Sequence, residues 1–305
     1  MISNPLADPL FLPTASLLSG ILGVGLVLLL VARRGRLAGL RQDVLLQRWA
    51  VWAIIAPLYS LAVLGGALPM LLLVSLLVGQ GLREYSHLVE LPPLYRRVVL
   101  ALGLAMGPLA IWLPREFFEV LPLLLLVGTL QPLLTQDVRT GMTHLAFAAL
   151  GFAYVPLLLD HLLLIRFWLA GGSGLLLAIG LAVALSDIGA FSVGRLVGKH
   201  QLSPLVSPNK TWEGVAGNVL GAALGIWLIG FALPPRVSGP LDLALPIVVA
   251  VGAVWGDLVE SLLKREFGVK DAAAWLPGFG GLLDRVDSLI VVAPLTYHLV
   301  RALSL

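Results

Sequence analysis

A succession of apolar stretches, each close to the length that crosses a lipid bilayer, most constrains what this chain can fold into. A transmembrane helix needs about 20 mainly apolar residues. Apolar runs bounded by charges and by Pro or Gly predict helices at 10–31, 49–65, 67–82, 98–113, 117–134, 143–160, 173–194, 214–233, 241–262 and 281–303. Breaks at Gly65-Gly66 and Pro114-Arg115 leave open whether each flanking pair is two spans or one tilted span with a re-entrant segment. We therefore expect an all-α, polytopic integral membrane protein with nine to ten transmembrane helices.

Charged residues are too scarce to form the surface of a soluble protein. Of the 305 residues, 59% are hydrophobic and 12% are charged, whereas soluble domains carry about 25% charged residues. Cysteine is absent, which excludes thiolate catalysis and cysteine metal sites. The net charge of +3 is too small to indicate a nucleic-acid partner. We expect one membrane domain over 1–305, in which 1–170 form a mainly apolar scaffold and 171–305 the catalytic half.

The basic residues predict the orientation of the chain. With ten spans, one set of alternate loops holds all but four of the Lys and Arg residues; the opposite set holds Arg115, Arg166, Arg236 and Arg301. Cytoplasmic loops are enriched in Lys and Arg. We therefore expect an inner-membrane protein whose charged face, with the active site, meets the cytoplasm.

Asp187, in segment 186–190, interrupts an otherwise apolar helix. A carboxylate there costs roughly 2.5–3.5 kcal/mol on insertion scales unless it is paired or metal-bound. Asp187 is therefore a candidate metal ligand. The alternative is a structural ion pair with Arg195, two turns further on.

The loop 203–214, with the sequence SPLVSPNKTWEG, is a candidate phosphate-binding segment. Its prolines and its asparagine predict a rigid turn, and Thr211 with Glu213 can start the next helix. It lacks the glycines of a Walker A loop, so its lysine would act as a point charge. The alternative is an ordinary cytoplasmic loop. The candidate substrate-binding residues of this loop are Ser207, Asn209, Lys210, Thr211 and Glu213.

Segment 256–288 concentrates acids and bases more than any other part of the chain. In a helix, Asp257, Glu260, Ser261 and Lys264 share one stripe. Carboxylates at helical spacing suit Mg²⁺, which prefers hard oxygen ligands and keeps positions open for phosphates. The alternative is a solvated charge stripe followed by a Gly/Pro turn. The predicted Mg²⁺ ligands, with a second cation left open, are Asp187, Asp257, Glu260, Asp284 and Asp287.

Two other groups of polar residues are expected to serve structure. The five histidines show no metal-ligand spacing. Arg83 and Glu84 lie within reach of the charged face, and we expect them to pair locally.

Segment 256–288 resembles the phosphatidate cytidylyltransferase (CDP-diacylglycerol synthase) family. The upstream stretch DIGAF…GR…GKH…SPNKTWEG is also similar to that family, so the resemblance covers residues from about 180 to 298. Phe279 stands where the family usually has His. The residues that match the family's C-terminal signature are Ser261, Lys264, Arg265, Lys270, Asp271, Gly280, Gly281, Asp284, Arg285 and Asp287.

The resemblance implies an Mg²⁺-dependent reaction of CTP with phosphatidate that gives CDP-diacylglycerol and pyrophosphate. It also implies a homodimer that takes its lipid from the membrane. We hypothesise that Asp257 and Asp284 are the principal metal ligands and that Arg285 binds the leaving pyrophosphate. Ser261, Asp271, Gly280 and Gly281 would contact substrate. The basic residues expected to hold the phosphates are Lys210, Lys264, Arg265 and Lys270. A CTP-dependent lipid kinase and an ion or phosphate transporter are the alternatives.

Overall fold

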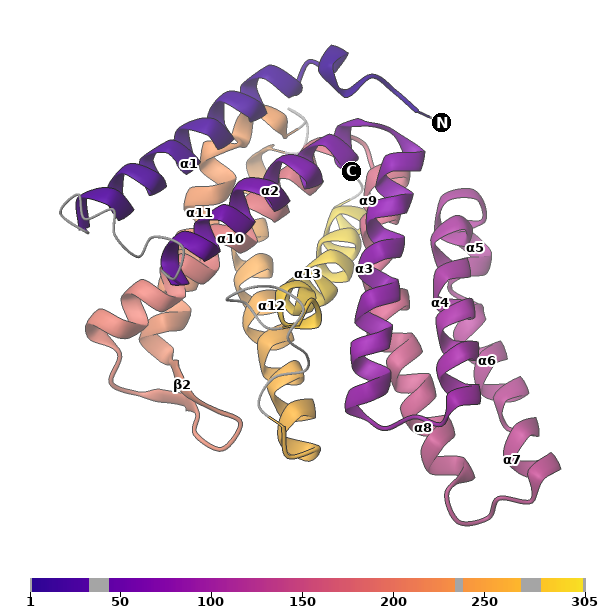
Figure 1. The fold of residues 1–305 in the computed structure, drawn as a ribbon. Coiled ribbons are helices and arrows are strands. Elements are labelled where there is room, and N and C mark those ends of the chain that lie inside the picture. The colour runs from indigo at the N-terminus through magenta and orange to yellow at the C-terminus, as the bar shows by residue number, and fades with distance from the viewer. Residues whose placement is uncertain (1, 33–43, 234–237, 270–280, 304–305) are drawn as a thin grey trace.

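The computed structural model describes residues 2–32, 44–233, 238–269 and 281–303, and this part of the chain is almost entirely helical. Figure 1 shows the helices as one bundle. The helices are α1 (Phe11–Ala32), α2 (Val44–Leu64), α3 (Ala67–Leu88), α4 (Pro93–Trp112), α5 (Pro114–Phe117), α6 (Val120–Gly128), α7 (Leu130–Thr135), α8 (Gly141–Phe152), α9 (His161–Trp168), α10 (Gly172–Val197), α11 (Trp212–Leu228), α12 (Ser238–Glu266) and α13 (Leu283–Ala302).

Seven segments of the described chain are long and apolar enough to cross a membrane, and Val120–Thr135 is a shorter apolar segment. The prediction of an all-α polytopic membrane protein is therefore confirmed. The expected nine to ten spans agree approximately, since α11 and α13 also lie where spans were expected. The seven segments are Phe11–Val31, Leu45–Leu64, Ala67–Leu88, Pro93–Trp112, Gly141–Trp168, Gly172–Val197 and Leu243–Glu266.

Two predicted helices differ in detail from the observed ones. The helix expected at 117–134 is divided among α5, α6 and α7. The helix expected at 143–160 continues to Trp168, because a π-helical segment, η3 (Ala153–Leu157), joins α8 to α9. Pro156 lies in this segment. Proline removes a backbone donor, and a π-bulge is one way for a helix to continue past the lost hydrogen bond.

The loop at 203–214, expected as a rigid turn, forms most of a short β-hairpin that begins at Gln201. Strands β1 (Gln201–Ser203) and β2 (Ser207–Thr211) pair in antiparallel fashion, with Gln201 opposite Thr211. Thr211 then starts α11, since its Oγ1 accepts a hydrogen bond of 3.1 Å from the amide of Gly214. In Figure 1 the hairpin lies at the same end of the bundle as the C-terminal end of α12.

Glycines bring two pairs of helices into close contact. A Cβ at Gly189 of α10 would lie 2.2 Å from the carbonyl oxygen of Gly217 on α11. In the second pair, a Cβ at Gly256 of α12 would lie 2.2 Å from the carbonyl oxygen of Asp287 on α13. Small residues at such positions let the backbones of membrane helices approach each other. Within each of these two pairs the helices, which carry or adjoin the charged segments, are thereby packed tightly together.

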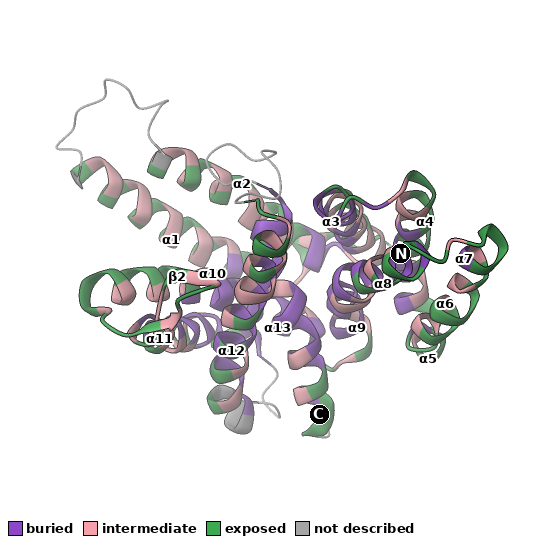
Figure 2. Cartoon of the chain, turned by 90° about the horizontal axis from the view of Figure 1, so that it is seen from below, coloured by how far each residue is buried: buried purple, intermediate pink, exposed green. Residues whose placement is uncertain are grey.

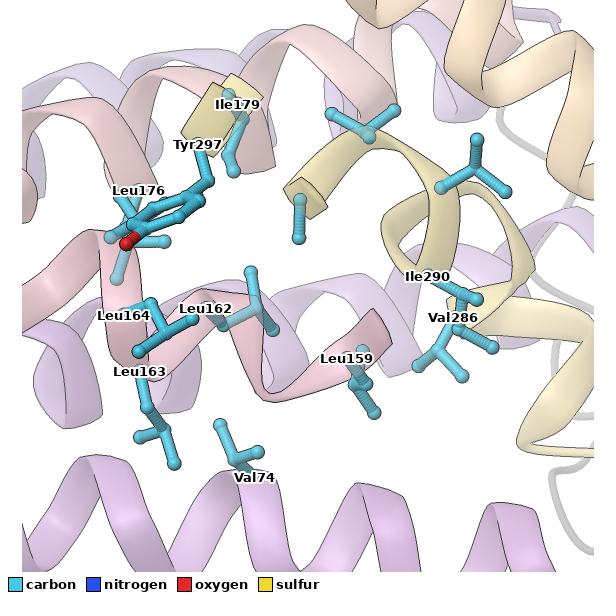
Figure 3. Close-up of a cluster of buried hydrophobic side chains, with 14 of the residues drawn as sticks. Val74, Leu159, Leu162, Leu163, Leu164, Leu176, Ile179, Val286, Ile290 and Tyr297 are labelled. Atoms are coloured by element: carbon cyan, nitrogen blue, oxygen red, sulfur yellow. The ribbon is translucent and has the colours of Figure 1, made fainter. Parts of the chain in front are cut away.

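The buried core lies where α3, α9, α10 and α13 meet. Figure 3 shows this cluster, in which Val74, Leu163, Leu176 and Ile290 are fully buried. Figure 2 shows α13 mostly buried, whereas α1 and α5 to α7 are largely intermediate or exposed. Their exposed residues are mainly apolar, Leu134 among them. A lipid environment accounts for such a surface, since soluble proteins rarely expose large apolar patches.

Candidate active site

The candidate site is built on the antiparallel contact of α12 with α13. The Gly256 contact brings the two helix backbones close together, and four carboxyl groups meet across the interface in two pairs. Asp257 meets Asp287, and one turn further on Glu260 meets Asp284. Each pair takes one acid from each helix, so the two acidic motifs of segment 256–288 form a single site.

One lysine contacts each pair of acids. The Nζ atom of Lys264 donates to Glu260 Oε2 at 3.1 Å and to Asp284 Oδ1 at 3.0 Å. The Nζ atom of Lys210, which comes from β2, donates to Asp257 Oδ2. The hairpin thus supplies a cation to an acid 47 residues further along the chain. Lysine is a compact charge that can bind an exposed phosphate oxygen.

Asp187 joins the same site from α10. Its carboxyl group interacts electrostatically with Asp257, Lys210 and Arg285. Arg195, the alternative partner, lies over the ring of Phe191, with its guanidinium carbon 5.8 Å from the ring centroid. The structure therefore places Asp187 with the charged residues of α12, α13 and the hairpin.

Glu213 supports the hairpin. Its Oε2 accepts hydrogen bonds from the amides of Lys199 at 3.1 Å and His200 at 3.2 Å, and its Oε1 lies 2.6 Å from His200 Nδ1. The contact with the His200 ring is the main reason that the pKa of Glu213 is lowered to about 2. Asn209 is exposed on the hairpin and Ser207 is half-buried. Of the five candidates in segment 203–214, all of which the structure describes, Lys210 is the one with a hydrogen bond to an acid of α12.

The remaining predicted residues surround these pairs or lie outside the described residues. Ser261 is half-buried next to Glu260. Arg265 is exposed, and its Nε donates to the carbonyl oxygen of Val206 at 3.5 Å, which links α12 to the hairpin. The amide of Gly281 donates to Asp284 Oδ2 at 3.2 Å. The predicted residues that lie outside the described part of the chain are Lys270, Asp271 and Gly280, together with Phe279.

Glu84 is a residue whose role the sequence prediction missed. Its carboxylate accepts hydrogen bonds from the amides of Leu282 at 3.0 Å and Leu283 at 2.8 Å, at the start of α13. Gln80, one turn earlier on α3, donates to the same carboxylate at 2.9 Å. The expectation of purely local pairing is therefore wrong. The signal that could have found Glu84 is the one that singled out Asp187: a carboxylate within an apolar helix needs a partner.

The donor atoms fit a hard divalent cation. The site holds several carboxylates, and within the described chain the buried Oε1 of Glu260 has no hydrogen-bond partner. Carboxylate oxygens are the ligands that Mg²⁺ prefers. Among the described residues, however, no three His, Asp or Glu side chains already converge on one point. The ligand chemistry is therefore present, while Lys210 and Lys264 engage the carboxylates in this arrangement.

The fold and the site together define a class of protein. Lysines and an arginine can bind phosphate oxygens, and carboxylates can bind the divalent cations that accompany nucleotides. These groups gather at one end of an apolar bundle. This arrangement is that of an integral membrane enzyme acting on phosphates.

Comparison with known proteins identifies the family. The profile of the cytidylyltransferase family matches residues 46–303, so the chain belongs to that family and is a nucleotidyltransferase. It is similar to the phosphatidate cytidylyltransferases of Staphylococcus saprophyticus (37% identity over 198 residues, 63% of this chain and 75% of the relative) and Pseudomonas aeruginosa (35% over 231 residues, 73% and 84%). The relative from Staphylococcus haemolyticus is 39% identical over 157 residues, which cover 52% of this chain and 59% of that protein.

Proposed function

We propose that this chain transfers the cytidylyl group of CTP to phosphatidate, giving CDP-diacylglycerol and pyrophosphate. The observation that carries the proposal is the pairing of α12 and α13, which sets two acid pairs beside Lys210 and Lys264. Membership of the cytidylyltransferase family favours nucleotidyl transfer over the lipid kinase and the transporter.

The chemistry requires positioning and charge neutralisation. An oxygen of the lipid phosphate attacks the α-phosphorus of CTP, a new P–O bond forms, and the bond to the β-phosphate bridging oxygen breaks as pyrophosphate leaves. The nucleophile is already an anion, so no general base is needed. The difficulty is to hold two polyanions in line, for which cationic side chains supply electrostatic stabilisation. We assign this role to Lys210, Lys264 and Arg265. We propose that Arg285 binds the leaving pyrophosphate.

The carboxylates are assigned to Mg²⁺. Asp257 and Asp284 would be the principal ligands, with Asp187, Glu260 and Asp287 as further ligands or supports. The cation supplies positive charge that lowers the repulsion between the two phosphate-bearing substrates. Between turnovers the two lysines offset part of the negative charge, which lowers the cost of holding several carboxylates in an apolar bundle.

The lipid substrate suggests the orientation and the assembly. We propose that the hairpin end of the bundle faces the cytoplasm, because most of the basic residues lie on that side. We also propose that phosphatidate enters between helices with its acyl chains in the bilayer, and that the chain forms a homodimer.

The orientation can be tested by cysteine labelling. The chain has no cysteine, so single cysteines placed at Lys199 and at Arg115 would report the accessibility of the two membrane faces separately. Labelling of both by the same impermeant reagent would contradict the proposed orientation.

The decisive experiment follows labelled CTP and phosphatidate with purified protein. Release of pyrophosphate with formation of CDP-diacylglycerol supports the proposal, whereas release of CDP would indicate a kinase. Uptake of ions or phosphate into proteoliposomes without conversion would indicate a transporter. The variants Asp257→Asn and Asp284→Asn should lose turnover, and full activity in either would remove the metal role assigned to that residue.

A further inference from the structure

The start of α13 is held by a side chain from the scaffold half of the protein. Glu84 lies on α3, 198 residues before Leu282 in the sequence, and it is 3% exposed. Figure 1 shows α13 lying between α12 and α3. Contacts to α12 on one side and to α3 on the other therefore both determine where α13 sits.

The Glu84 carboxylate satisfies donors that the helix itself leaves open. The first amides of an α-helix have no partner within the helix. Oε1 of Glu84 accepts from Leu282 at 3.0 Å, and Oε2 accepts from Leu283 at 2.8 Å. Leu282 occupies the N-cap position of α13, and its apolar side chain has no acceptor to offer. A carboxylate here is also favoured by the helix dipole and by charge-assisted hydrogen bonding.

The division of the α13 amides between two acids leaves Asp284 able to contact Lys264. Asp284 Oδ2 accepts from the Gly281 amide at 3.2 Å, and its Oδ1 accepts from Lys264 at 3.0 Å. Glu84 takes the next two amides. If Glu84 were absent, the amides of Leu282 and Leu283 would be buried without an acceptor, and the first turn of α13 would have to move.

The first two turns of α13 carry the acids that meet α12: Asp284 lies in the first turn and Asp287 at the start of the second. Asp284 must face Glu260, and Asp287 must face Asp257, for the two acid pairs to form. The Gly256 contact fixes the distance between the helices. It does not by itself fix the rotation or tilt of the first turn of α13, whereas two hydrogen bonds to one rigid carboxylate constrain both.

We propose that Glu84 is a positioning residue of the active site, which acts through the backbone of α13 to hold Asp284 and Asp287 in register with α12. This inference rests on the proposed function, because its effect on turnover presupposes the cytidylyl transfer. A local capping side chain could have satisfied the same amides. A buried glutamate from α3 additionally ties the apolar scaffold to the catalytic half.

The test compares Glu84→Gln with a variant of the adjacent residue. The carboxamide introduced by Glu84→Gln would turn an NH₂ group toward a backbone N–H, so one of the two helix-start bonds is lost while the volume is kept. Support residues behind metal ligands typically contribute about 10–100-fold to activity, and we expect kcat to fall by about that factor. Hydrogen exchange should show reduced protection of the Leu282 and Leu283 amides.

Tyr85→Phe is the matched control for loss of a buried hydrogen bond on α3. The Tyr85 hydroxyl donates to the carbonyl oxygen of Phe147 at 2.9 Å, away from α13. We expect Tyr85→Phe to lower the melting temperature while kcat and the protection of the α13 amides stay near wild type. A decrease in kcat proportional to the lost melting temperature in both variants would overturn the positioning role.

The two measurements separate this inference from the proposed function. If wild-type protein makes no CDP-diacylglycerol, the proposed function fails. The hydrogen-exchange measurement on Glu84→Gln still tests whether Glu84 holds the start of α13. If wild-type protein is active and Glu84→Gln keeps both full kcat and full protection, the inference is wrong. Should Glu84→Gln fail to fold, Glu84→Asp decides, since its shorter side chain keeps the charge. Turnover and protection should then fall together, and a loss of protection with unchanged kcat would overturn the proposal.

Discussion

The backbone of Gly256 on α12 touches that of Asp287 on α13, so closely that an added Cβ would lie 2.2 Å from the Asp287 carbonyl oxygen. This contact lies directly beside Asp257. No flexible side chain can give way there, because the clash would be with backbone. The position of one glycine therefore sets the distance across which the acid pairs meet.

The first prediction is that Gly256→Ala disrupts the site. The added methyl group must push α13 away, and overpacking of this kind typically costs about 1–3 kcal/mol. We expect a lower melting temperature and a loss of turnover greater than the loss of folded protein. Gly23→Ala on α1 is the control, since no described atom beyond its own stretch of helix lies within 4 Å of a Cβ there. Wild-type turnover in Gly256→Ala would show that the helix contact does not set the site geometry.

The second prediction concerns the ion pair between Lys210 and Asp257. We expect Lys210→Met to lower kcat/KM by about 10²–10³-fold, the size of effect seen when one preorganised electrostatic group is removed. Lys199→Met is the control, because Lys199 is exposed and belongs to the same connection between α10 and α11.

A double-mutant cycle separates the pair from two independent effects. If Lys210 and Asp257 act as a unit, Lys210→Met combined with Asp257→Asn should be less impaired than the product of the single losses. Strict multiplicativity would argue against a functional pair.

Local sequence rules predicted most of the helices and singled out several of the charged residues that the fold brings together. Scarce charge and long apolar runs required membrane helices, and the cost of an intramembrane carboxylate singled out Asp187. Helical spacing placed Asp257, Glu260 and Lys264 on one stripe. These inferences succeed because each depends on residues within a few turns of one another.

What the sequence could not give are the contacts between distant segments. Asp257 faces Asp287 because α12 and α13 meet at Gly256, and no local pattern states that register. Lys210 reaches Asp257 through a β-hairpin, which was not expected because the prolines and polar residues of the loop resemble a turn. Glu84 was assigned to local pairing because its partners, the backbone amides of α13, have no side-chain signature.

The third prediction is a pH dependence at the hairpin. Contacts with the His200 ring and with nearby backbone amides lower the pKa of Glu213 from 4.5 to about 2. A group whose pKa is lower in the folded state contributes stability that is fully present above its unfolded value and is lost as the pH falls through its folded value. The melting-temperature difference between wild type and Glu213→Gln should therefore narrow as the pH falls from 4.5 to 2. A difference that stays constant down to pH 2 would contradict this assignment.

The fourth prediction is that divalent cations bind at the acid pairs even without substrate. The lysines leave Glu260 Oε1 without a hydrogen-bond partner within the described chain, and an apolar bundle strengthens the attraction of a carboxylate for a hard cation. Chelation should abolish turnover, and added Mg²⁺ should restore it. Mn²⁺ binding can be followed by electron paramagnetic resonance. In Asp284→Asn the affinity should fall at least tenfold, which is roughly 1.4 kcal/mol. It should remain unchanged in Asp137→Asn, because the carboxylate of Asp137 caps the turn before α8. Asp284 contacts both Lys264 and Glu260, so its replacement by Asn changes the charge at the proposed site. Equal Mn²⁺ affinity in the two variants would therefore show that the cation binds elsewhere.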